Sequence, residues 1–259
     1  MIKFLLIVLG VGLPLLAQKP LLELGVGVAA VRYPAYIGAK KEKYFGVAFP
    51  YINYRGEWLE IDNGGVKKEL FDIDGLGLEL SASGSFPVDS ASSKLREGMA
   101  DLDLMFEIGG MGSYALWDKD DYHLLFRLPL RAVISTNFHS RLDYRGVVAN
   151  PEVKFSQKNR EGELFVNTGA VFASSEYHDY LYGVENIYKT EQREVYQGRG
   201  GYGGWRSKMG FSQRKKAWVY DAYVVHYFLR GAVFEDSPLL ERENAFFIQA
   251  SLSYIFYTR

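Results

Sequence analysis

The sequence predicts an all-β fold, a transmembrane antiparallel β-barrel of about 12 strands, with about 10 as the alternative. Three observations support this prediction. Apolar and polar residues alternate over long segments, aromatic residues gather near the ends of those segments, and no helical period follows the N-terminal region. Because a strand sends successive side chains to opposite faces, such alternation produces ribbons with one apolar face.

The clearest alternation runs from Tyr122 to Ile134. One parity there is almost wholly apolar, whereas the other contains Arg127 and Arg131. The segment that starts at Asp101 and the C-terminal segment 246–256 repeat the pattern, and weaker copies begin near residues 22, 45, 76, 144, 164 and 218. The polar parities contain five charged residues that we expect to line the lumen: Asp101, Asp103, Glu107, Arg127 and Arg131.

Two all-β architectures produce such alternation. In a soluble sandwich or a lipocalin-like barrel the apolar parity points inward, whereas in a membrane barrel it faces lipid and the polar parity fills the lumen. The segments are close to the ~9–11 residues that a tilted strand needs to cross a bilayer. Aromatic residues such as Trp117, Tyr122 and Trp218 stand near segment ends, where interfacial girdles form. These features favour the membrane barrel.

Residues 1–17 have the features of a secretory signal peptide. Lys3 is the only charge before an apolar run from Phe4 to Leu16, which is shorter than the ~20 residues of a membrane-spanning helix. Ala17 ends a plausible cleavage site, and the chain has no cysteine that could carry a lipid anchor. We therefore expect export and a single barrel domain at residues 18–259, with a buried N-terminal strand or helix as the alternative.

Parity assigns the connections to the two ends of the barrel. If both termini lie in the periplasm, the strand number is even and the connections alternate between the two sides. The predicted external connections are 33–43, 63–65, 86–99, 136–143, 175–199 and 231–243. The predicted periplasmic turns are 55–56, 74–75, 116–121, 157–161 and 213–216. The two short strands beside residues 63–65 decide between twelve strands and ten.

Composition argues against several functions. Lys and Arg number 30 against 31 Asp and Glu, so no basic field attracts nucleic acid, and the absence of cysteine removes thiolate chemistry. The four histidines, His123, His139, His178 and His226, do not have the spacing of a metal site. We expect no enzymatic activity, no metal and no cofactor.

The lumen charges and one loop each have two interpretations. Glu107 would lie near Arg127 if the turn at 116–121 sets the register, and such pairs would fill a narrow lumen. A charged pore eyelet is the alternative. The tyrosines of loop 175–199 predict either a recognition surface or an aromatic collar folded into the mouth.

Several short motifs lie along the chain, among them residues 34–38 (PAYIG) and residues 229–239 (LRGAVFEDSPL). The first is similar to the Pro-x-Tyr-x-Gly motif, and the second to the Asp-Ser-Pro loop, of the MipA/OmpV family of outer-membrane proteins. Residues 49–52 and 180–184 also match, and the motifs follow in order along nearly the whole mature chain. The family positions are Pro34, Tyr36, Gly38, Gly183, Asp236, Ser237 and Pro238.

The resemblance implies a barrel in the outer membrane of a Gram-negative bacterium, in contact with outer-membrane lipid. MipA-like membership implies a scaffold that links a lytic transglycosylase with a bifunctional penicillin-binding protein in cell-wall growth. OmpV-like membership implies a small-solute porin or an adhesin. For Asp236, Ser237 and Pro238 we predict a structural lock in the last external loop, because proline and short polar side chains fix turns.

Overall fold

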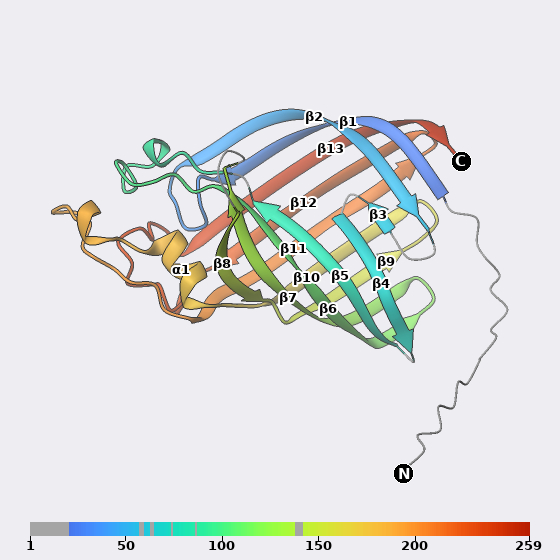
Figure 1. The fold of residues 1–259 in the computed structure, drawn as a ribbon. Helices are drawn as coiled ribbons and strands as arrows, with labels where there is room; N and C mark the ends of the chain where they lie inside the picture. The colour runs from blue at the N-terminus through green and yellow to red at the C-terminus, as the bar shows by residue number, and fades with distance from the viewer. Residues whose placement is uncertain (1–20, 57–59, 63–64, 74, 86, 138–141) are drawn as a thin grey trace, which may run out of the picture.

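The computed structural model describes residues 21–56, 60–62, 65–73, 75–85, 87–137 and 142–259. The predicted signal peptide lies outside these residues. In the described residues one antiparallel sheet closes on itself as a barrel (Figure 1). Its strands are β1 (Leu21–Pro34), β2 (Glu42–Arg55), β3 (Glu60–Asp62), β4 (Gly65–Ile73), β5 (Leu76–Ser85), β6 (Leu104–Lys119), β7 (Tyr122–Thr136), β8 (Leu142–Ala149), β9 (Glu152–Lys158), β10 (Gly162–Ala173), β11 (Gly201–Lys215), β12 (Trp218–Phe228) and β13 (Asn244–Thr258).

Each strand pairs with its neighbours in chain order, and β13 pairs with β1 to close the ring. β8 and β9 lie end to end between β7 and β10, where the sequence predicts one strand. They are separated at Asn150 and Pro151. Proline has no backbone N–H to donate to a ladder, which explains the interruption.

β3 is far shorter than its neighbours. Among the described residues it pairs with β2 at Tyr54 and Arg55 alone, and its pairing with β4 begins at Gly65. The predicted external turn at 63–65 lies largely outside the described residues. β3 starts opposite Arg55, at the end of β2, and Asp62 already pairs with Gly65 of β4. This hairpin therefore stays near the end of β2, and the predicted external position of 63–65 is wrong.

The two ends of the barrel differ in their connections. One end, here called the terminal end, holds the start of β1 and the end of β13, joined by a hydrogen bond of 3.0 Å from the Leu22 N–H to the Arg259 carbonyl. The opposite end, the loop end, carries the long connections and three short helices (Figure 1): η1 (Ser90–Ser92), α1 (Ser175–Tyr182) and η2 (Asn186–Tyr188). This distribution agrees with the predicted alternation of long and short connections.

The turn predicted at 116–121 is shorter than expected. β6 continues to Lys119 and β7 begins at Tyr122, so only Asp120 and Asp121 connect them. Asp120 has φ of 54°, a left-handed conformation that Asp tolerates better than most residues. The longer strands change the register between β6 and β7.

The outer wall is apolar along the predicted parity. Leu128, Leu130, Phe246 and Ile248 are 39–55% exposed, although they lie within regular strands. A contiguous exposed apolar surface of this kind marks an interaction surface or a lipid-facing wall. The soluble-barrel alternative requires these side chains to point inward, and the structure places them outward.

Aromatic rings stack near the terminal end, as an interfacial girdle requires. Trp117 stacks with Tyr122 at 6.4 Å between ring centroids, and Tyr122 with Phe155 at 6.2 Å. Trp218 packs against Tyr254 at 4.9 Å. Such rings suit a position where one end of the side chain is apolar and the other is wet.

Within the described ranges, none of the helices has both the length and the apolar character to cross a membrane.

Candidate functional site: a loop cap, a charged lumen and a rim pocket

The family-motif residues meet at the loop end, although they lie far apart in the chain. The Tyr36 hydroxyl donates to the Leu239 carbonyl at 2.6 Å, and the Tyr182 hydroxyl donates to the Ile37 carbonyl at 2.9 Å. The Ser237 hydroxyl donates to the Tyr182 carbonyl at 2.7 Å. Connections 35–41, 174–200 and 229–243 are therefore fastened to one another; together with connection 87–103 we call them the loop cap.

The remaining motif residues have structural positions in the same region. Gly38 has φ of 95°, and its carbonyl accepts hydrogen bonds from the backbone N–H groups of Glu241 and Arg242 at 3.0 and 2.9 Å. A Cβ at Gly183 would lie 2.4 Å from the Asp179 carbonyl oxygen, so a side chain has no room there. Pro34 is the last residue of β1.

Asp236 and Ser237 face in different directions. Ser237 is buried and also accepts the Leu239 N–H at 3.2 Å. The Asp236 side chain is 86% exposed, with Arg199 at 3.9 Å. Among the described residues, the side chain of Ser237 bonds to backbone groups and that of Asp236 does not, so Ser237 makes the contacts of the predicted structural lock.

A buried aromatic core fills the cap. The Tyr182 ring stacks on Phe234 at 3.8 Å between centroids, and His178 packs edge-on against Phe234 at 4.9 Å. Met105 and Val133, which belong to the barrel strands, join the same apolar cluster. Tyr177, Tyr180 and Tyr196 pack against this cluster, and Tyr182 belongs to it. Four of the five tyrosines of loop 175–199 therefore form an aromatic collar, whereas Tyr188 is not part of it.

Burial favours the neutral forms of two tyrosines and one histidine of the cap. Burial raises the pKa of Tyr36 to about 12 and raises the pKa of Tyr182 well above its ordinary value. Burial also lowers the pKa of His178, against the opposing effect of its hydrogen bond with the Arg199 carbonyl at 2.7 Å. A neutral imidazole held against a backbone carbonyl is a packing element of the cap.

Two buried arginines tie further loops into the cap. Arg96 donates to the Leu181 carbonyl at 3.0 Å, and Arg193 donates to the Leu95 and Glu97 carbonyls at 2.7 and 3.1 Å. Neither arginine stands out in the sequence. Their partners are backbone carbonyls of distant loops, and no spacing in the sequence indicates such contacts.

Three of the five predicted lumen charges form ion pairs. Glu107 lies 3.5 Å from Arg131. Arg127 pairs with Glu152, which Arg206 also approaches at 3.7 Å. The expected pair of Glu107 with Arg127 is not formed, because the longer β6 and β7 place Arg127 opposite Ser113.

Asp101 and Asp103 differ from the prediction. β6 begins at Leu104, so both residues lie in the loop cap and not on a strand lining the lumen. The Asp101 carboxylate accepts the Ser90 N–H at 2.7 Å, and the Asp103 N–H donates to the Tyr180 hydroxyl at 2.7 Å. The prediction was wrong because the alternation of apolar and polar residues begins at Asp101, before the strand itself begins at Leu104.

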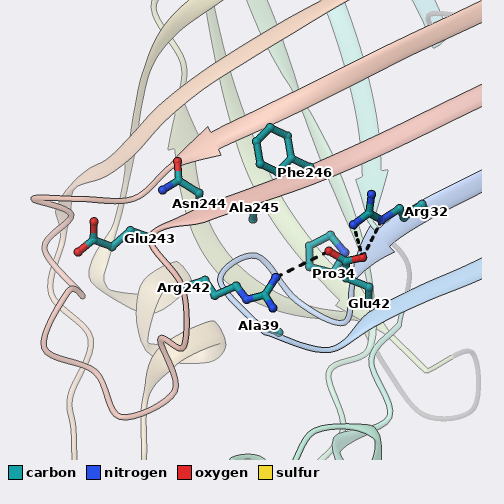
Figure 2. Close-up of a pocket in the computed structure, with 9 residues that line it drawn as sticks. All are labelled: Arg32, Pro34, Ala39, Glu42, Arg242, Glu243, Asn244, Ala245 and Phe246. Atoms are coloured by element: carbon teal, nitrogen blue, oxygen red, sulfur yellow. Dashed lines mark hydrogen bonds and ion pairs between the residues drawn. The ribbon is translucent and has the colours of Figure 1, made fainter.

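A pocket of about 570 Å³ opens at the rim of the loop end (Figure 2). Its charged groups are Arg32 on β1, Glu42 on β2, and Arg242 with Glu243 in the last loop. Arg32 donates to the Glu42 carboxylate at 2.6 Å, and Arg242 lies 3.9 Å from the same carboxylate. Pro34, Ala39, Ala245 and Phe246 supply the apolar lining. One signal in the sequence could have indicated this pocket. Arg32 is a charged residue among the otherwise apolar residues on the outward face of β1.

Within the part of the chain that the structure describes, no three His, Asp or Glu side chains gather as metal ligands would.

The closed antiparallel ring, the apolar outer wall and the charged lumen define a membrane-type β-barrel. A family model described as "MltA-interacting protein MipA" matches residues 26–256. The chain belongs to this family, as its motifs predict.

Comparison with solved structures finds other barrels at low similarity. The translocator domain of the autotransporter NalP from Neisseria meningitidis has 9% identity and a TM-score of 0.40, with 91% of this chain and 88% of that chain covered. The outer-membrane expressed OmpT of Vibrio cholerae has 8% identity and a TM-score of 0.36, with 93% and 99% covered. A Pseudomonas aeruginosa FadL homologue has 10% identity and a TM-score of 0.34, with 93% and 91% covered. Among curated proteins, no sequence matches this chain.

Proposed function

We propose that this protein is a barrel of the Gram-negative outer membrane that acts as a scaffold. It would hold a lytic transglycosylase, together with a bifunctional penicillin-binding protein, during murein growth. The observation that carries this proposal is the family match over residues 26–256, because the family is described by its interaction with MltA.

We further propose a barrel of twelve strand positions. β8 and β9 then count as one crossing, and β3 occupies a position of its own. The three residues of β3 fall short of the ~9–11 that a crossing strand needs. Without β3 eleven positions remain, so the ten-strand alternative also requires leaving out β4, which has nine residues.

The loop cap favours a scaffold function and argues against an open pore. Its core contains Tyr182, Leu229 and Phe234, all buried, and it joins the inner face of the strands through Val133. Packed aromatic side chains leave little room for solute passage. A barrel closed on the outside is suited to anchoring a partner.

The terminal end presents a charged surface to the periplasm. The turn after β9 and the turn after β11 are adjacent, since the Arg214 N–H donates to the Glu161 carbonyl at 2.6 Å. Five cations are exposed around these two turns: Lys158, Arg160, Arg214, Lys215 and Lys216. We propose that an acidic face of the transglycosylase docks on this edge, since complementary charge fixes orientation and speeds association.

The test is a pull-down of a purified lytic transglycosylase with the folded barrel in detergent. The double variant Lys215→Glu/Lys216→Glu should lose most of the binding. The matched control Lys40→Glu/Lys41→Glu makes the same charge change at exposed positions of the loop end and should bind normally. If the wild-type barrel captures no transglycosylase, the scaffold proposal is wrong. If both double variants bind normally, the docking edge is wrong.

A small-solute pore is the second candidate, and one feature of the lumen favours it. Lys208 lies over the Tyr223 ring at 4.0 Å and, among the described residues, has no carboxylate within 4 Å. Glu152 is shared by Arg127 and Arg206, so this wall has a surplus of cations. Anion-selective conductance of the purified barrel in planar bilayers would support the pore, whereas an electrically silent barrel would support the scaffold.

A further inference from the structure

The rim pocket lies on the outside of the barrel wall. In the ladders Arg32 is opposite Ile248 on one side and Tyr44 on the other. Neighbours opposite each other in a ladder share a face of the sheet. Ile248 is 39% exposed and Tyr44 is 70% exposed, so the Arg32 side chain also belongs to the outward face.

The pocket contains a guanidinium with free donors. Arg32 is held by Glu42 through both Nε and Nη2. Arg242 is 3.9 Å from Glu42, which is beyond hydrogen-bond distance, and no side-chain hydrogen bond of Arg242 occurs within the described residues. A guanidinium carries five N–H donors in a fork that matches a phosphate or carboxylate. Figure 2 shows Arg32 and Arg242 approaching Glu42 from opposite sides.

The other half of the pocket is apolar and continuous with the lipid-facing wall. Phe246 lines the pocket and is 44% exposed, and Ile248 follows it two residues later on the same parity of β13. A ligand that fills this pocket therefore meets charge at the rim and hydrocarbon below it. Free phosphate would use only the first of these surfaces.

We propose that this pocket binds a phosphorylated, acylated glycolipid of the outer leaflet. Its phosphate would accept hydrogen bonds from Arg242 with Arg32 alongside, and an acyl chain would lie along Phe246 and Ile248. The Glu42 carboxylate fixes Arg32 and the exposed Glu243 carboxylate lies at the edge, so Arg242 supplies most of the attraction. The proposal rests on the outer-membrane location proposed above, and it is independent of the transglycosylase.

Native mass spectrometry of the purified, folded barrel with bis-phosphorylated lipid A tests this proposal. Arg242→Gln should weaken binding about tenfold, because a charge-assisted hydrogen bond to phosphate is lost. Arg242→Lys should be intermediate, since it keeps the charge and loses the fork. The control Arg230→Gln removes an exposed cation of the same loop outside the pocket and should bind like the wild type.

Two further ligands, dephosphorylated lipid A and inorganic phosphate, distinguish a lipid-binding site from a site for free phosphate. Dephosphorylated lipid A should bind about as weakly to the wild type as phosphorylated lipid A does to Arg242→Gln. Inorganic phosphate in excess should not displace lipid A. Equal binding by all variants, or by dephosphorylated lipid A, would overturn the proposal. Displacement by inorganic phosphate would show an anion site with no preference for lipid. A heat-induced shift of each variant in gel electrophoresis confirms that the barrel compared is folded.

Discussion

Replacing Ser237 by Ala is the most direct test of the loop cap. The Ser237 hydroxyl donates to the Tyr182 carbonyl at 2.7 Å and accepts the Leu239 N–H at 3.2 Å. It thus links the last loop to the end of α1. Alanine removes one oxygen and leaves the backbone path unchanged.

The expected cost follows from the groups left without partners. Leu239 is fully buried and Tyr182 is almost fully buried, so water cannot replace the hydroxyl at either group. An unsatisfied buried polar group costs about 1–3 kcal/mol. We expect opening of the cap to become easier by about 2 kcal/mol, which corresponds to a population of the open state about 30-fold higher.

Limited proteolysis and hydrogen exchange measure this opening. Trypsin cleavage after Arg230 and Arg242, at the two ends of the loop, should be faster in Ser237→Ala, and the Leu239 amide should exchange faster. Asp236→Ala is the matched control, because that side chain is 86% exposed and should change stability by less than about 0.5 kcal/mol. If Ser237→Ala is cleaved no faster than Asp236→Ala, the hydroxyl does not lock the cap.

Three other predictions concern the lumen and the cap. Glu152→Gln should destabilise the folded barrel by about 3 kcal/mol in urea titrations, because it leaves the Arg127 charge unpaired. As a control, Glu194→Gln removes one partner of an exposed ion pair and should cost less than about 1 kcal/mol. Equal unfolding midpoints for the two variants would refute the pairing. Burial lowers the pKa of His178 below its ordinary 6.5, so the unfolded cap binds more protons than the folded cap as the pH falls below 6.5. The stability of the cap should therefore decrease over that range. Proteolysis at pH 7.5 and at pH 5 should show this dependence in the wild type and not in His178→Gln. Gly38→Ala should loosen the cap, because a side chain is strained at φ of 95° and its Cβ would lie 2.5 Å from the Leu240 side chain; an unchanged cleavage rate would contradict this.

The strand assignments depended on local information and could be made from the sequence. The alternation from Tyr122 to Ile134 predicts which face is apolar, and the structure exposes Leu128 and Leu130 as that pattern requires. The register could not be predicted in the same way. The pairing of Glu107 with Arg131 and not with Arg127 depends on how far β6 and β7 extend, which two turn residues and a bulge near Trp117 decide.

The sequence by itself determined the class of fold, the parity of the wall, the order of long and short connections and the family. These properties follow from the two-residue period of a strand and from short motifs, which are local in the chain. Only the tertiary structure decided which motif residues touch, where Asp101 and Asp103 lie, and that Arg32, Glu42 and Arg242 surround one pocket. Contacts such as that of Tyr36 with Leu239 join residues about two hundred positions apart, and they exist only because ring closure brings the first and last strands together.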